Sequence, residues 1–250
     1  MEFEDAEIIL NASMVVGYPP LFIVGDNTIG KTTLLKAMCS KFNKTTIFTT
    51  AIDYGGLKEF VKVADKNIKT IVLSDIQSVL SRKKPVQEAT FGYISTLIEE
   101  GITNEITFAK AGREASGVKL NVILAGTPRH VVRLIRLGEI DLLTRFLYIP
   151  VERDLDKVDL TKEFKLQDGL PSKIKKSDLL KFDRLDEIDI KIKNIRYRKM
   201  INTIILALLS FGYDKDKIKN LIKGIMIFNP LEDEGLNWVQ LYMKAMKPII

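Results

Sequence analysis

A short segment near the start of the chain has the residue pattern of a phosphate-binding loop. Gly25-Asp26-Asn27-Thr28-Ile29-Gly30-Lys31-Thr32 fits G-x-x-x-x-G-K-[ST] at every required position. The glycines let the backbone fold around phosphate groups, so that successive N–H groups form a nest for an anion. We expect the Lys31 ammonium to reach the β- and γ-phosphates and the Thr32 hydroxyl to bind Mg²⁺. The predicted cofactors are therefore ATP and Mg²⁺, and the predicted nucleotide-binding residues are Gly25, Asp26, Asn27, Thr28, Ile29, Gly30, Lys31, Thr32 and Thr33.

A carboxylate follows a second apolar run, where a P-loop enzyme usually holds the metal. Thr70-Ile71-Val72-Leu73 is followed by Ser74-Asp75. An acid at the end of a neighbouring strand binds Mg²⁺ through water. Asp75 is therefore a predicted metal ligand, together with Thr32, and a predicted catalytic residue. It can also cap the helix that follows, and both roles are compatible.

The residue after Asp75 departs from the hydrolytic pattern, which carries a second acid there to activate water. Here that residue is Ile76. Two interpretations stay open: Asp75 is the base with Ser74 in the metal position, or the base lies elsewhere, with Asp53 as one candidate. Gln77 could orient a water molecule but cannot take its proton. The hydrolysis rate is therefore open, whereas nucleotide binding is not affected.

Alternating strands and helices must position these side chains. Short apolar runs predict strands at 21–24, 45–50, 70–73, 105–108, 120–125 and 146–151. Helical spacing predicts helices at 6–16, 31–42, 57–64, 86–100 and 128–137, and residues 112–117 are rich in turn formers. This order predicts an α/β fold in which a parallel sheet is flanked by helices.

The composition changes after Val151. Residues 152–190 are highly charged and weakly periodic, which predicts a linker with short elements. Residues 191–250 regain helical spacing, with helices expected near 195–211, 218–225 and 236–246. We therefore predict a P-loop ATPase core over 1–151, a linker over 152–190 and a helical lid or effector domain over 191–250.

Four features in this order resemble the AAA+ and related additional-strand (ASCE) P-loop ATPases. They are the phosphate loop, the strand ending at Asp75, the polar Thr127 after Leu120–Gly126, and Arg145 in Leu142-Leu143-Thr144-Arg145-Phe146. The resemblance covers residues 6 to 151. It implies that Thr127 senses the γ-phosphate and that Arg145 is a finger acting on the nucleotide of a neighbouring subunit.

Other roles for these residues remain open. Thr127 could cap the helix after Pro128, and Arg145 could form an ordinary salt bridge, perhaps with Asp141. Either Arg196 or Arg198 could be the second sensor of the class, or part of a solvated helix face. A planar guanidinium can bind two phosphate oxygens at once, which favours the arginine-finger interpretation of Arg145.

The overall composition limits the partners and the compartment. The net charge is +6 and the pI about 9.2, a balance that favours polyanions such as nucleic acid. The acidic start and the lack of a long apolar run argue against export and a membrane span, so we expect a cytoplasmic protein.

With one cysteine, Cys39, and one histidine, His130, the chain cannot form a Cys/His zinc cage, and Cys39 is expected in the core. Lys173, Lys175 and Lys176 form a basic cluster that could touch a nucleic-acid backbone or be a solvated charge run.

The resemblance implies a homo-oligomeric ATPase that acts on DNA or on DNA-replication proteins. Two other classes are alternatives. A nucleotide-dependent switch or adaptor with little turnover would explain Ile76. A nucleotide kinase would need acceptor-site arginines and a lid inserted within the core, and the sequence has no clear insertion.

Overall fold

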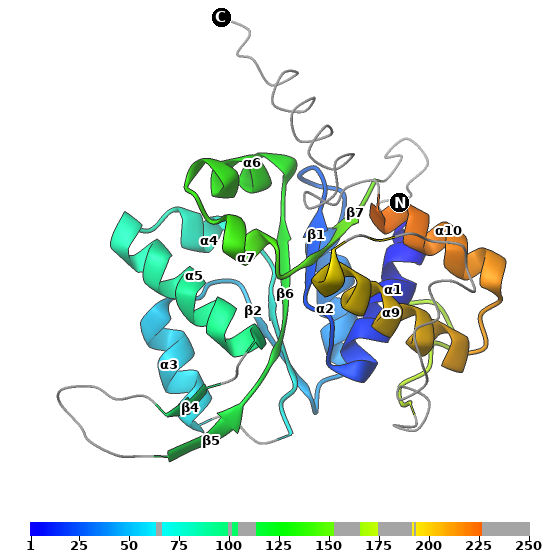
Figure 1. Cartoon of the computed structure of the whole chain (residues 1–250), viewed down its shortest axis with the longest axis horizontal. Helices are drawn as coiled ribbons and strands as arrows, with labels where there is room; N and C mark the ends of the chain where they lie inside the picture. Colours follow the sequence, from blue (N-terminus) through cyan, green and yellow to red (C-terminus); the bar gives the residue numbers. More distant parts are fainter. Residues whose placement is uncertain are drawn as a thin grey trace, which may run out of the picture.

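The centre of the fold is a parallel sheet of five strands. The computed structural model describes residues 1–63, 67–99, 102–104, 114–152, 166–174, 192 and 194–226. The sheet order is β2-β3-β6-β1-β7 (Figure 1). Its strands are β1 (Leu21–Val24), β2 (Thr46–Thr49), β3 (Thr70–Leu73), β6 (Asn121–Gly126) and β7 (Leu147–Pro150). The predicted α/β fold with a parallel sheet flanked by helices is confirmed.

The strand register places the candidate functional residues at one edge of the sheet. Val24 lies opposite Gly126, and Leu73 lies opposite Leu124, so β1, β3 and β6 end at nearly the same level. Because the strands are parallel, the loops that follow them meet at this carboxyl edge of the sheet. The phosphate-loop segment and Asp75 therefore lie on neighbouring loops, with the end of β6 between them.

Helices cover both faces of the sheet, which makes a three-layer fold. Leu21 and Ile23 belong to one core cluster, whereas Phe22 and Val24 belong to the other, as the period-2 alternation of a strand requires. The first cluster includes α1 (Phe3–Val16), α2 (Lys31–Lys41), α9 (Ile195–Ser210) and α10 (Lys215–Met226). The second includes α3 (Tyr54–Val63), α4 (Gln77–Leu80), α5 (Lys84–Glu99), α6 (Pro128–Arg136) and α7 (Ile140–Leu143). Both faces are buried, which explains why the central strand β1 is apolar throughout, whereas the edge strand β2, which is mostly only partly buried, begins and ends with threonine.

One region differs from the sequence prediction. The expected strand at 105–108 lies outside the described residues. The structure instead pairs β4 (Ile102–Asn104) antiparallel with β5 (Glu114–Val118) in a separate two-stranded sheet. The turn expected at 112–117 is therefore wrong for residues 114–117. Cross-strand hydrogen bonds with β4 outweigh the weak strand preference of Ser116 and Gly117.

The C-terminal helices pack on the sheet. The amide N–H of Tyr197 donates to Asn194 Oδ1 at 3.1 Å, which caps the start of α9. Ile204 of α9 and Ile222 of α10 are fully buried in the cluster that also contains α1 and β7. The helix expected at 236–246 lies outside the described residues, as does most of the expected linker, so the three-part division stays a prediction. None of the helices within the described ranges is long and apolar enough to cross a membrane.

Candidate functional site

The predicted phosphate loop connects β1 to α2. Val24 ends the strand, and Lys31 begins the helix. Gly30 stands before the helix in the left-handed region, with a φ of 98°, and Thr28 also has a positive φ of 71°. Only glycine adopts such angles without strain, so Gly30 is required by the backbone path. The segment therefore turns sharply into the N-terminus of α2, where N–H groups have no intrahelical acceptor.

Gly25 has no room for a side chain. A Cβ at this position would lie 2.4 Å from Ile29 Cδ1 and 2.5 Å from the Val151 carbonyl oxygen. The Gly25 N–H donates to Gly126 O at 3.2 Å, and the Val151 N–H donates to Val24 O at 2.7 Å. The base of the loop is thus fixed between the ends of β6 and β7.

The Lys31 side chain folds back over its own loop. Its Nζ donates to the carbonyl oxygens of Gly25 at 2.8 Å and Asp26 at 2.5 Å. Burial lowers the pKa of Lys31, and the nearby carboxylates of Asp26 and Asp75 partly offset that shift. The ammonium therefore lies within the curve of the loop, with two acidic groups around it.

A polar cavity of about 280 Å³ lies between the loop and the ends of two strands. It is lined by Asn27, Thr28, Gly30, Lys31, Thr32, Thr33, Ser74, Asp75, Gly126 and Thr127. The structure thus brings Asp75 and Thr127 together with most of the predicted loop. Gly25, Asp26 and Ile29 do not line the cavity, and Ile29 is buried beneath the loop.

Asp75 both lines the cavity and is hydrogen-bonded to the start of α4. Its Oδ1 accepts a hydrogen bond from the Gln77 N–H at 2.9 Å, which caps α4, and its side chain is 56% exposed at the cavity. Ser74, which is 7% exposed, lines the same cavity. Ile76 is fully buried in the second core cluster, where a carboxylate would be costly to desolvate. The fold therefore excludes a second acid directly after Asp75.

Asp53 lies outside the phosphate-loop cavity, at the start of α3. It caps α3 through a hydrogen bond from the Gly56 N–H to its Oδ1 at 2.8 Å, and it is not among the residues that line the phosphate-loop cavity. Gln77 is also absent from that lining. Of the acids considered for the base, Asp75 alone lines this cavity among the described residues.

His130 is a neighbour of the site that the sequence interpretation did not identify. The Thr127 N–H donates to His130 Nδ1 at 3.3 Å, and this nitrogen lies 3.8 Å from Asp75 Oδ1. Burial lowers the pKa of His130, while the Asp75 carboxylate acts in the opposite direction. The available signal was local: a histidine three residues after the helix cap Thr127 folds back on the start of α6.

Arg145 lies away from the cavity of its own chain. It precedes β7, near the start of the sheet, where the Leu147 N–H donates to Pro20 O at 3.0 Å. Its guanidinium forms an ion pair with Glu99 at the end of α5, and not with Asp141. Burial and the neighbouring Arg196 lower the pKa of Arg145. Its Nε is buried without a hydrogen-bond partner in the described part of the chain.

Arg196 joins this distant cluster. Its Nη2 lies 2.6 Å from Glu99 Oε1, and its Nη1 donates to Thr144 Oγ1 at 3.0 Å. Neither Arg196 nor Arg198 lines the phosphate-loop cavity. The structure therefore does not place either arginine where the second-sensor interpretation needs it. Glu99, which holds both Arg145 and Arg196, had no distinguishing signal in the sequence.

The structure also locates Cys39 and one lysine of the basic cluster. Cys39 is buried in the first core cluster, as predicted, and burial raises the pKa of its thiol to about 12. Of the basic cluster, Lys173 is exposed, whereas Lys175 and Lys176 lie outside the described residues.

Two comparisons with known proteins found no match. No protein-family model matches the chain, and no curated protein matches it. The functional argument therefore rests on the geometry of the cavity.

Proposed function

We propose that the chain binds Mg-ATP in the cavity formed by residues 27–28 and 30–33, Ser74, Asp75, Gly126 and Thr127. The observation that carries the proposal is the convergence of the loop, a carboxylate and a threonine from the ends of three adjacent strands. The polar groups of this cavity suit the phosphates and the metal of Mg-ATP. Backbone N–H groups and the Lys31 ammonium match phosphate oxygens, while the Thr32 hydroxyl and the Asp75 carboxylate supply the oxygen ligands that Mg²⁺ prefers.

Each residue of the cavity has a separate role in the proposed hydrolysis. Lys31 exchanges its hydrogen bonds to Gly25 and Asp26 for phosphate oxygens. Thr32 and Asp75 hold the metal, which when bound neutralises charge on the β- and γ-phosphates. Asp75 also orients the attacking water or accepts its proton. Of the acids considered for this role, it alone lines the cavity among the described residues. Thr127 faces the same space from the end of β6.

We further propose that the chain is an ATPase of the AAA+-like class, which its strand order and the position of Arg145 support. β6 lies between β1 and β3, which matches the additional strand for which the class is named. Arg145 lies at the start of β7, away from its own loop, and its side chain is 16% exposed in an ion pair with Glu99. To serve the nucleotide of a neighbouring subunit it would have to leave Glu99. The proposed assembly is a homo-oligomer that acts on DNA or on DNA-replication proteins.

A nucleotide-dependent switch with little turnover is the second candidate. It is favoured by one observation: the position that would hold a second acid is Ile76, which is fully buried. Such a protein would bind Mg-ATP in the same cavity and change its partners without rapid hydrolysis.

Phosphate release from ATP, measured with and without single-stranded DNA, tests this proposal. We expect Mg²⁺-dependent release that DNA accelerates, because the proposed machine acts on DNA. Binding of Mg-ATP with negligible release under both conditions would favour the switch. Transfer of the phosphate to a second nucleotide would contradict both candidates.

A further inference from the structure

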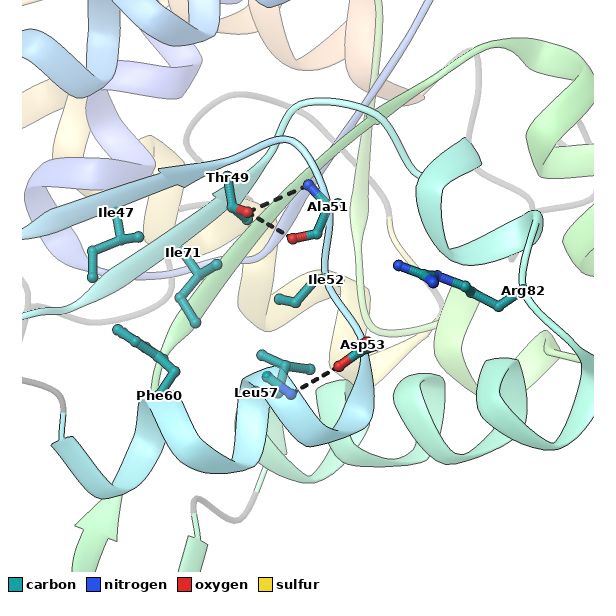
Figure 2. Close-up of a pocket in the computed structure, with 10 residues that line it drawn as sticks. Ile47, Thr49, Ala51, Ile52, Asp53, Leu57, Phe60, Ile71 and Arg82 are labelled. Atoms are coloured by element: carbon teal, nitrogen blue, oxygen red, sulfur yellow. Dashed lines mark hydrogen bonds between the residues drawn. The ribbon is translucent and has the colours of Figure 1, made fainter.

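A second cavity, of about 330 Å³, lies beside the strands β2 and β3 (Figure 2). It is formed by the edge strand β2, by α3, and by the turn that follows α4. Its lining consists of Ile47, Thr49, Ala51, Ile52, Asp53, Gly56, Leu57, Phe60, Ile71 and Arg82. None of these residues lines the phosphate-loop cavity, so the two spaces are separate.

The walls of this second cavity are mainly apolar. Ile47 and Ile71 come from adjacent strands, and Leu57 and Phe60 face them from α3 (Figure 2). Ile52 and Phe60 are only partly buried, so apolar surface remains open to a ligand. Small-molecule sites occupy roughly 300–1,000 Å³ and combine apolar walls with a few polar groups. The volume and the lining both fall within that class.

The polar groups of the cavity differ in whether they already have partners. The Thr49 hydroxyl donates to the Ala51 carbonyl at 2.7 Å, and Asp53 Oδ1 accepts from the Gly56 N–H at 2.8 Å. The Arg82 guanidinium makes no hydrogen bond or ion pair with any part of the chain that the structure describes. Arg82 is therefore the polar group with donors available to a ligand.

Arg82 is fixed at its backbone and directed into the cavity. Its N–H donates to Val79 O at 3.0 Å, and its carbonyl accepts from Gln87 Nε2 at 2.5 Å. Its side chain extends toward Ile52 and Asp53, from the side opposite Phe60 (Figure 2). A guanidinium in this setting is suited to a carboxylate, to which it can donate two parallel hydrogen bonds.

We propose that this cavity binds a small molecule with an apolar body and one carboxylate, the carboxylate at Arg82 and the body between Phe60, Leu57 and Ile71. The one acid in the lining, Asp53, is already bonded to the start of α3, whose dipole offsets part of its charge. The inference does not depend on nucleotide binding, because no residue of the phosphate loop takes part in it.

Octanoate is a probe with this chemistry, and 1-octanol is its neutral counterpart. Calorimetric titration of the full chain without nucleotide should show saturable binding of octanoate at one site and weaker binding of 1-octanol. Arg82→Met should weaken octanoate binding about tenfold or more, as expected for a lost charge-assisted hydrogen bond, and leave 1-octanol binding unchanged. Arg136→Met is the matched control, because it removes an exposed arginine from α6, outside this cavity, and should have no effect.

Filling the cavity with a large side chain is a second test, which does not depend on the charge of the probe. Ala51→Trp places a large side chain at an exposed position of the lining and should abolish binding of both probes. Circular dichroism and thermal unfolding show whether each variant is folded, and Ala51→Leu replaces the tryptophan variant if that one unfolds. The proposal is overturned if octanoate does not bind the wild-type chain, if Arg136→Met weakens binding as much as Arg82→Met, or if filling the cavity leaves the affinity unchanged.

Discussion

Replacement of Asp75 by Asn should leave Mg-ATP bound and slow phosphate release by about a hundredfold or more. Asparagine keeps an oxygen that can accept from the Gln77 N–H, so the cap of α4 survives. It cannot accept a proton, and it binds Mg²⁺ more weakly than a carboxylate. General-base catalysis contributes roughly 10²- to 10⁴-fold. Steady-state phosphate release at saturating ATP, together with a binding titration, separates loss of turnover from loss of affinity.

Asp53→Asn is the matched control for this experiment. It makes the same chemical change at the cap of α3, outside the phosphate-loop cavity. Its turnover should equal that of the wild type. If Asp53→Asn stops turnover and Asp75→Asn does not, the acid has been assigned to the wrong residue.

Replacement of Arg145 by Ala should preserve ATP binding and reduce turnover by a large factor. An arginine finger contributes about 10³- to 10⁵-fold in GTPases. Arg145 lies at the start of β7, whereas the phosphate loop follows the end of β1, so the residue is poorly placed to serve its own nucleotide. Mixing Arg145→Ala with Lys31→Ala should restore part of the activity, because some interfaces then pair an intact loop with an intact arginine.

Two further observations test whether Arg145 acts across an interface. Turnover per chain of the wild type should rise with protein concentration, as expected if subunits must associate. Arg196→Ala removes the other arginine bound to Glu99 and should retain far more activity than Arg145→Ala. A mixture that stays inactive, with turnover independent of concentration, would mean that Arg145 has only a structural role.

The sequence predicted the parts of the fold that depend on local pattern. The strands at 21–24 and 70–73 have the predicted bounds because short apolar runs end at Gly25 and at Ser74-Asp75. The phosphate loop could be predicted from the sequence because its residue types follow one another along the chain. The meeting of Asp75 and Thr127 with the loop followed from the expectation of a parallel sheet, whose strands end at one edge.

Contacts between distant residues could not be predicted in this way. Glu99 holds Arg145 and Arg196, which are 46 and 97 positions away in the sequence. The proximity of His130 to Asp75 depends on how α6 leaves β6, and the antiparallel pairing of β4 with β5 depends on hydrogen bonds rather than residue preference. The second cavity needs Arg82 and Phe60 to lie at its opposite sides, and neither residue type signals that arrangement.

Calorimetric titration of Mg-ATP into the wild-type chain and into Lys31→Ala is the most direct test of the nucleotide site. The wild type should bind one nucleotide per chain. The variant should bind at least about tenfold to a hundredfold more weakly, because charge-assisted hydrogen bonds to the phosphates are lost. Lys36→Ala removes an exposed lysine from the same helix, outside the cavity, and should bind as the wild type does. Equal affinity of Lys31→Ala and the wild type, or no binding by the wild type, would contradict the assignment of residues 25–33 as the nucleotide site.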